Sequence, residues 1–152
     1  MASISLEKSA DGAGASSRLG KDSELVRFSV IVKIARSDPS RPFEKGLKHW
    51  MEGHKNPERY GDVITDVYEA VEALAKSVTG RDADLSANRE KFASVLTLPE
   101  AYSKMLKEYV DFGCEYRHSP ETNKPRTYPS ERDTEAFIYV TGVFLRLAMQ
   151  TK

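Results

Sequence analysis

Apolar side chains recur at steps of three and four residues between positions 57 and 80, and this period constrains the fold more than any other feature of the chain. The apolar positions are Val63, Ile64, Val67, Tyr68, Val71, Leu74, Ala75 and Val78. An α-helix has about 3.6 residues per turn, so these side chains form one helical face. Pro57 suits a first turn, and Gly80 is typical of a helix end. We predict a long helix from 57 to 80.

Three shorter stretches carry the same period, and we predict helices at 43–53, 86–96 and 99–116. Pro39 and Pro42 make a break before the first of them, and Pro99 follows the second. The predicted buried positions are Phe43, Leu47, Trp50 and Met51 in the first, Phe92, Val95 and Leu96 in the second, and Tyr102, Met105, Leu106, Tyr109, Val110 and Gly113 in the third.

The last predicted helix covers 133–150. Ser130 with Asp133 resembles a capping box, which satisfies backbone N–H groups at a helix start. Apolar side chains occupy more than half of the circumference of this helix, so we expect it to be buried on several sides. Because one bundle face needs fewer apolar positions, we also predict that the chain forms a homodimer through it.

The N-terminal part of the chain divides into two segments. Residues 1–21 are rich in Ser, Gly and Ala, and we expect a disordered tail. The segment 25–35 fits two patterns: alternate apolar residues indicate a strand, whereas a spacing of three to four residues and the potential cap at Asp22 and Ser23 favour a helix. The residue pattern favours the helix without deciding between them.

The whole pattern predicts an all-α fold, an antiparallel helical bundle of about five or six helices. A length of 152 residues corresponds to one domain, which we place at 22–152. Lys and Arg together number 23, as do Asp and Glu, so any contact with nucleic acid must be local. A lone cysteine, Cys114, favours a reducing compartment and a cytoplasmic location. No apolar run is long enough for a membrane span.

Several kinds of chemistry find little support in the residues. His49 and His54 lack the spacing of a zinc helix, and no glycine-rich phosphate loop is present, so we expect no metal and no cofactor. We predict that Cys114 is a half-buried structural cysteine. The carboxylates Asp66, Glu69 and Glu72 share one helix, and we expect solvated faces for them, with partial burial of Glu72 alone.

The pair Arg117 and His118 is the most pointed candidate for chemistry. It ends the helix 99–116 beside a proline-rich loop that contains Lys124 and Arg126. Arg recognises phosphate, and His transfers protons near neutral pH, so the pair could position and cleave a phosphodiester. The alternative is that both side chains only cap the helix carbonyls and interact with the negative end of its dipole.

Three segments in this order resemble the HEPN superfamily, and within it the small domains of abortive-infection and phage-defence proteins. They are YEAVEALAKSVTGRD, LPEAYSKMLKEYVDFGCEYRH and SERDTEAFIYVTGVFLRL, and the resemblance covers about 57–150. It implies a helical bundle that dimerises, and in many members a metal-independent ribonuclease whose Arg and His are separated by several residues. In this chain the two residues are adjacent, which is similar to an Arg-His variant for which catalysis does not follow from the motif.

By this resemblance Arg117 and His118 match the motif region, and Lys124 or Arg126 would hold RNA. Glu72 and Lys76 match polar positions of the preceding long helix, and Glu135 matches an acidic position early in the last one. The resemblance implies a role in nucleic-acid-linked defence or stress response and, if the chain is an enzyme, metal-independent cleavage of RNA. The alternative is a noncatalytic helical module that dimerises or binds a partner protein.

Overall fold

The computed structural model describes residues 39–117 and 127–150, and these residues form five helices and no strand. The helices are α2 (Ser40–Gly53), α3 (Arg59–Thr79), α4 (Leu85–Val95), α5 (Glu100–Arg117) and α6 (Glu131–Gln150). The all-α prediction is therefore confirmed. The expected tail at 1–21 and the ambiguous segment 25–35 lie outside the described residues.

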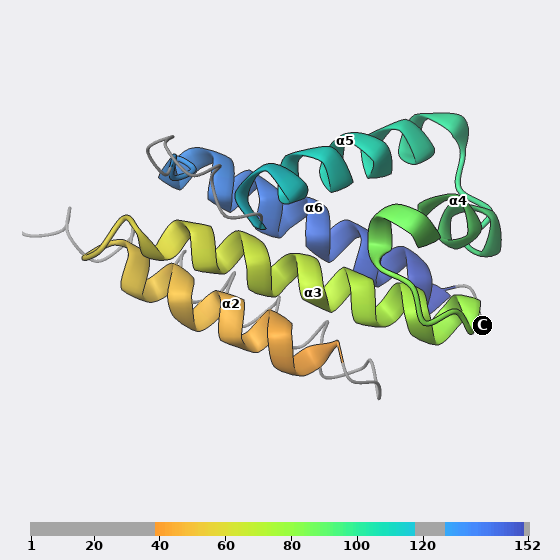
Figure 1. Ribbon diagram of the computed structural model, residues 1–152, viewed down its shortest axis with the longest axis horizontal. Helices are drawn as coiled ribbons and strands as arrows, with labels where there is room; N and C mark the ends of the chain where they lie inside the picture. The colour runs from red at the N-terminus through yellow and green to blue at the C-terminus, as the bar shows by residue number, and fades with distance from the viewer. Residues whose placement is uncertain (1–38, 118–126, 151–152) are drawn as a thin grey trace, which may run out of the picture.

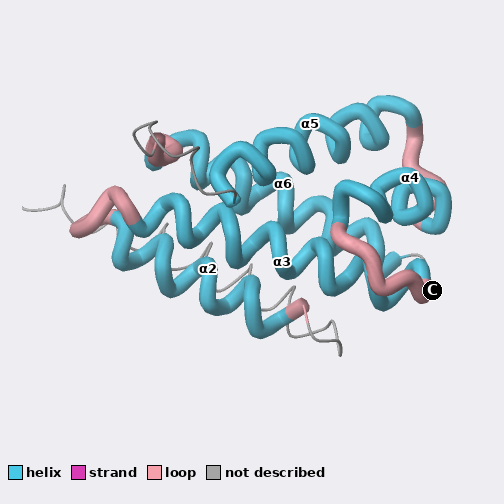
Figure 2. Tube along the Cα trace, viewed as in Figure 1, coloured by secondary structure: helices cyan, strands magenta, loops and turns pink. Residues whose placement is uncertain are grey.

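Helix α3 is the centre of the bundle, and each of the other four helices packs against it. Figure 1 shows α2 along one side of α3, with α5 and α6 on the other side and α4 across one end. The tube in Figure 2 shows that α2 and α3 form a hairpin with a short connection. This central place follows from the sequence, because the apolar residues of α3 extend around much of its circumference.

The predicted apolar face of α3 is confirmed. Seven of its eight predicted positions are buried, and Val78 packs against the core from a partly buried position. Gly80 ends the helix in the left-handed region with a φ of 68°, where a glycine has no steric penalty. The helix begins at Arg59, so Pro57 lies in the turn that precedes it.

The cap that Ser130 provides in the predicted capping box at the start of α6 is confirmed, and the Asp133 carboxylate contacts the Ser130 hydroxyl. The backbone N–H of Asp133 donates to Ser130 Oγ over 3.1 Å, and Ser130 Oγ donates to Asp133 Oδ2 over 2.7 Å. Asp84 caps α4 in a similar way by accepting from the backbone N–H of Ala87. These contacts fix where both helices begin.

Three sequence predictions about the smaller helices are wrong. Helix α2 begins at Ser40 and includes Pro42, since a proline in the first turn removes no intrahelical hydrogen bond. Met51 is 60% exposed, because Phe43, Leu47 and two glycines form the buried side of α2. Tyr102 is 42% exposed, since it lies in the first turn of α5, before the contact with the core begins.

Aromatic rings join α3, α5 and α6 inside the bundle. The ring of Tyr109 stacks on Phe137 with 4.2 Å between the centroids and lies parallel to Tyr68 at 5.9 Å. The Tyr109 hydroxyl lies 2.9 Å from Thr141 Oγ1, so its polar atom has a partner within the core. Gly113 makes room for this arrangement, because a Cβ there would lie 2.3 Å from the Tyr68 ring.

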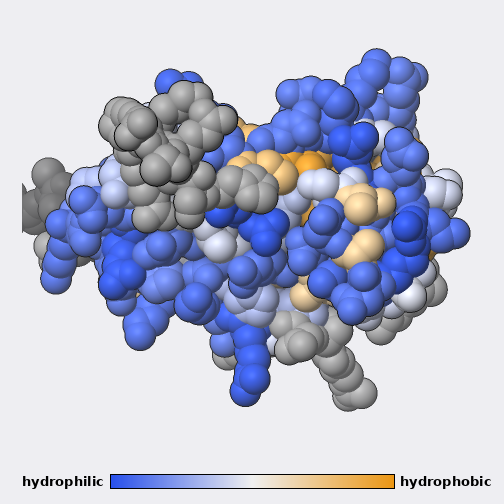
Figure 3. All heavy atoms as spheres, viewed as in Figure 1, coloured by the Kyte–Doolittle hydropathy of each residue, from blue (hydrophilic) through white to orange (hydrophobic). Residues whose placement is uncertain are grey.

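Hydrophilic side chains cover most of the face shown in Figure 3, and hydrophobic atoms are confined to small areas of it. None of the helices in the described residues is long and apolar enough to span a bilayer.

Candidate functional site

Three of the residues singled out in the sequence lie together where the end of α5 meets α3. Arg117 Nη1 lies 3.5 Å from Glu72 Oε2, and Lys76 Nζ lies 3.4 Å from Glu72 Oε1. Lys76 also pairs with Asp82 at 3.2 Å. We call Arg117, Glu72, Lys76 and Asp82 the charge cluster. Two cations and two carboxylates make it neutral as a whole.

Tyr68 forms a platform beneath Arg117. The guanidinium carbon of Arg117 lies 4.2 Å from the centre of the Tyr68 ring, which is a cation–π contact. Tyr68 is completely buried, and this burial raises the pKa of its hydroxyl to about 12. The ring is therefore neutral at physiological pH, and it holds the guanidinium in a fixed plane while 24% of the Arg117 side chain stays exposed.

The Glu72 carboxylate contacts groups on three helices, and these contacts fix its position beside Arg117. Its Oε2 accepts a hydrogen bond from the backbone N–H of Leu85 over 3.2 Å, at the start of α4. The carboxylate thus links α3 to α4 while it pairs with the end of α5. The predicted partial burial of Glu72 is confirmed. The contact of Glu72 with Leu85 and the contact of Arg117 with Tyr68 had no signal of their own in the sequence. Each joins two elements that are distant along the chain.

Cys114 lies beside this cluster, one helical turn before Arg117. Its Sγ lies 3.5 Å from Ser86 Oγ and 3.7 Å from the Tyr68 hydroxyl, and the residue is half-buried. The predicted half-burial is confirmed. These weak contacts with sulfur help to bring α4 and α5 together over α3.

The other predicted site residues do not join the charge cluster in the part of the chain that the structure describes. His118, Lys124 and Arg126 lie outside the described residues. Glu135 is exposed on α6, and no described contact links it to Glu72 or Arg117. Within residues 39–117 and 127–150, no group of His, Cys, Asp and Glu is placed to hold a metal ion.

A second polar cluster, between α2 and α3, corrects the prediction that Asp66 is solvated. Asp66 is 2% exposed, and its carboxylate lies 2.7 Å from both Lys45 Nζ and His49 Nδ1. An ionised carboxylate only accepts hydrogen bonds, so His49 donates from Nδ1. Asp66 follows Val63 by three residues and precedes Val67, and this place within the apolar face was the signal for its burial.

The geometry of the charge cluster suits anion recognition better than proton transfer by its own members. One guanidinium nitrogen of Arg117 pairs with Glu72, and the guanidinium has further N–H donors that could reach a phosphate oxygen.

No protein-family model, curated protein or solved structure compared with this chain matches it.

Proposed function

We propose that this chain is a HEPN-like helical domain that acts in nucleic-acid-linked defence or stress response and cleaves RNA without a metal ion. The observation that supports this most is the placement of Arg117. Its guanidinium is held by Glu72 and lies on Tyr68, immediately before His118 in the chain. Three positions that the resemblance selected, Arg117, Glu72 and Lys76, also meet at one place.

In the proposed reaction, a ribose 2′-hydroxyl attacks the adjacent phosphorus, and the bond from phosphorus to the 5′-oxygen breaks. His118 removes the hydroxyl proton or protonates the leaving 5′-oxygen, since an imidazole can act as base or acid near neutral pH, and solvent water carries the other proton. Arg117 stabilises the negative charge that develops on the phosphorane oxygens. Glu72 and Tyr68 act as positioning residues, because they hold the guanidinium in one orientation before the substrate binds.

We propose that this site is composite, assembled from Arg117 and His118 of two copies of the chain in a homodimer, with Lys124 or Arg126 holding the RNA backbone. Analytical ultracentrifugation at micromolar concentration tests the dimer. A dimer is expected, and a monomer would remove the composite site from the proposal.

The second candidate is a noncatalytic helical module that dimerises or binds a partner protein. The same contacts of Arg117 favour it, because a guanidinium paired with Glu72 and stacked on Tyr68 also ties α5 to α3 without any substrate. In this function Arg117 is a structural residue, and His118 transfers no proton.

Cleavage of labelled tRNA and single-stranded RNA in EDTA distinguishes the two candidates. The purified chain is compared with His118→Ala and Arg117→Ala, and with His54→Ala as a matched control. His54 is a half-exposed histidine whose described partner is Glu131 rather than the charge cluster. We expect cleavage by the wild type and the control, and loss of cleavage in the other two variants. No cleavage by the wild type favours the noncatalytic module, and equal cleavage by all four chains contradicts the site.

A further inference from the structure

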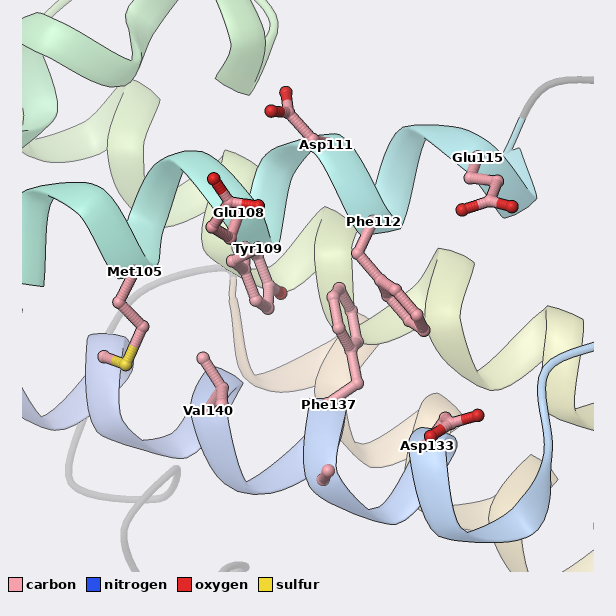
Figure 4. A pocket seen from close by; sticks show the side chains of 10 residues that line it. Met105, Glu108, Tyr109, Asp111, Phe112, Glu115, Asp133, Phe137 and Val140 are labelled. Carbon is pink, nitrogen blue, oxygen red and sulfur yellow. The ribbon is translucent and has the colours of Figure 1, made fainter.

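A groove of about 550 Å³ runs between α5 and α6, and no residue of the charge cluster lines it. Both helices pack against α3. Side chains from both helices line the groove between them. Figure 4 shows Phe112 and Phe137 pointing towards each other from the two helices, with Met105 and Val140 facing the same gap. These four partly or fully buried side chains form an apolar floor.

Carboxylates surround this floor. Glu108, Asp111 and Glu115 of α5 and Asp133 of α6 line the groove, and none of the lining residues within 39–117 and 127–150 is basic. Glu115 and Asp133 lie at the same end in Figure 4. Burial raises the pKa of the Tyr116 hydroxyl, and the negative charges of Glu115 and Asp133 raise it further, so both carboxylates act on this neighbouring residue. Lys107 pairs with Glu108 and Asp111 from the exposed side of α5, whereas no cation among the described residues pairs with Glu115 or Asp133.

The groove is long enough for a short helix. From Met105 to Glu115 the rise along α5 is about 15 Å, at about 1.5 Å per residue, which equals some three turns of a bound helix. On α6, Val143 follows Val140 on the same face and is 40% exposed, so the apolar strip continues beyond the groove. A bound helix would place apolar residues at every third or fourth position on this strip.

We propose that this groove binds a basic amphipathic helix of a partner protein. Its apolar face would cover Phe112, Phe137 and Val140, and its Lys or Arg side chains would pair with Glu115 and Asp133. Charge complementarity selects this occupant over RNA, whose phosphates the carboxylates repel. It also disfavours a second copy related by a two-fold axis through the groove, since such a contact places these carboxylates against one another.

A labelled peptide provides the test. The probe is a helical peptide of about 14 residues with leucine on one face and lysine on the other, and its fluorescence anisotropy is followed as the full chain is added. We expect saturable binding at micromolar concentration. A peptide of the same composition, with its leucines scattered around the helix, should bind at least about tenfold more weakly. Equal binding of the two peptides, or no binding of the first, would overturn the proposal.

Two variants locate the binding on the protein. The double change Glu108→Arg and Glu115→Arg reverses exposed charges on the groove and should weaken binding at least about tenfold. Glu44→Arg with Glu90→Arg makes the same change in net charge at exposed positions of α2 and α4 and should leave binding unchanged. An equal loss in both double variants would show that the peptide binds to general negative charge and would contradict the groove.

Val140→Asn tests the apolar floor, with thermal unfolding by circular dichroism as the check on folding. A folded Val140→Asn chain that binds the peptide as the wild type does would also overturn the proposal. Competition between the labelled peptide and single-stranded RNA tests whether the groove binds nucleic acid instead of a protein helix. RNA should not displace the peptide, and displacement would assign the groove to nucleic acid instead.

Discussion

The guanidinium of Arg117 lies over the ring of Tyr68, with 4.2 Å between the guanidinium carbon and the ring centre. The two residues are 49 positions apart, at the end of α5 and in the middle of α3. Glu72, one helical turn beyond Tyr68, completes the contact by pairing with Arg117. This relationship gives Arg117 a defined orientation, and it connects the candidate site to the stability of the bundle.

Loss of the Arg117 contacts should lower the stability of the fold modestly. Arg117→Met keeps most of the length of the side chain and removes the charge, so we expect a loss of about 1 kcal/mol in the free energy of unfolding. Urea denaturation measures it. Arg146→Met is the control, since Arg146 is exposed on α6 and has no described ion pair. An equal effect of the two changes would show that the contact with Tyr68 and Glu72 is not stabilising.

The titration of Tyr68 should make the fold unstable in alkali. Its pKa is raised to about 12 by burial, whereas an unfolded tyrosine titrates near about 10. The unfolded state therefore loses its proton first, and the contribution of the neutral ring is complete below pH 10 and declines as the pH rises from 10 to 12. The full contribution is about 2 to 3 kcal/mol.

Denaturation at a series of pH values tests this dependence, with Tyr68→Phe as the comparison. The variant keeps the ring and should differ from the wild type by about 1 kcal/mol or less at pH 8, because the hydroxyl loses a hydrogen bond with Ser86 and a weak contact with Cys114. Between pH 10 and 12 the stability of the variant should decline less steeply. Curves that stay parallel across this range would contradict the burial of the hydroxyl.

A methyl group at position 113 should disturb the aromatic core. A Cβ at Gly113 would lie 2.3 Å from the Tyr68 ring and 3.2 Å from Phe137, so Gly113→Ala should cost about 1 to 3 kcal/mol of stability. Gly61→Ala is a matched control in α3, where the nearest atom to a new Cβ is 3.9 Å away in Tyr128. That change should be neutral or stabilising by up to about 1 kcal/mol. Thermal unfolding that ranks the variants in the opposite order would contradict the close contact.

The buried carboxylate of Asp66 should matter more than its neighbours on α3. Asp66→Asn removes the charge that Lys45 and His49 share, and we expect a loss of about 1.5 to 3 kcal/mol in the free energy of unfolding. Lys45→Met should cost less, because the lysine side chain is 61% exposed and its charge is screened by water. Glu69→Gln, on the exposed side of the same helix, should have no effect in urea denaturation. Equal losses for Asp66→Asn and Glu69→Gln would contradict the buried pair.

Most helix positions follow from the order of residues along the chain. The spacing of apolar residues predicted α3, α4 and α5 within two residues at each end, and Gly80 and the Ser130–Asp133 capping box defined two of the boundaries. This was predictable because helical period, capping and glycine conformation are local properties that neighbouring residues control. The start of α2 was predicted wrongly from local properties. Pro42 was interpreted as part of a break before the helix, whereas α2 begins at Ser40 and includes it.

Which polar residues meet and which apolar residues stay exposed depends on how the helices pack. Asp66 was expected in solvent and is buried, because Lys45 and His49 of α2 reach it across the contact between the helices. The pairing of Arg117 with Glu72 and the acidic groove between α5 and α6 likewise depend on how the helices pack against α3. The period of a sequence shows which face of a helix is apolar. What lies opposite that face is set by contacts between segments that are far apart in the chain.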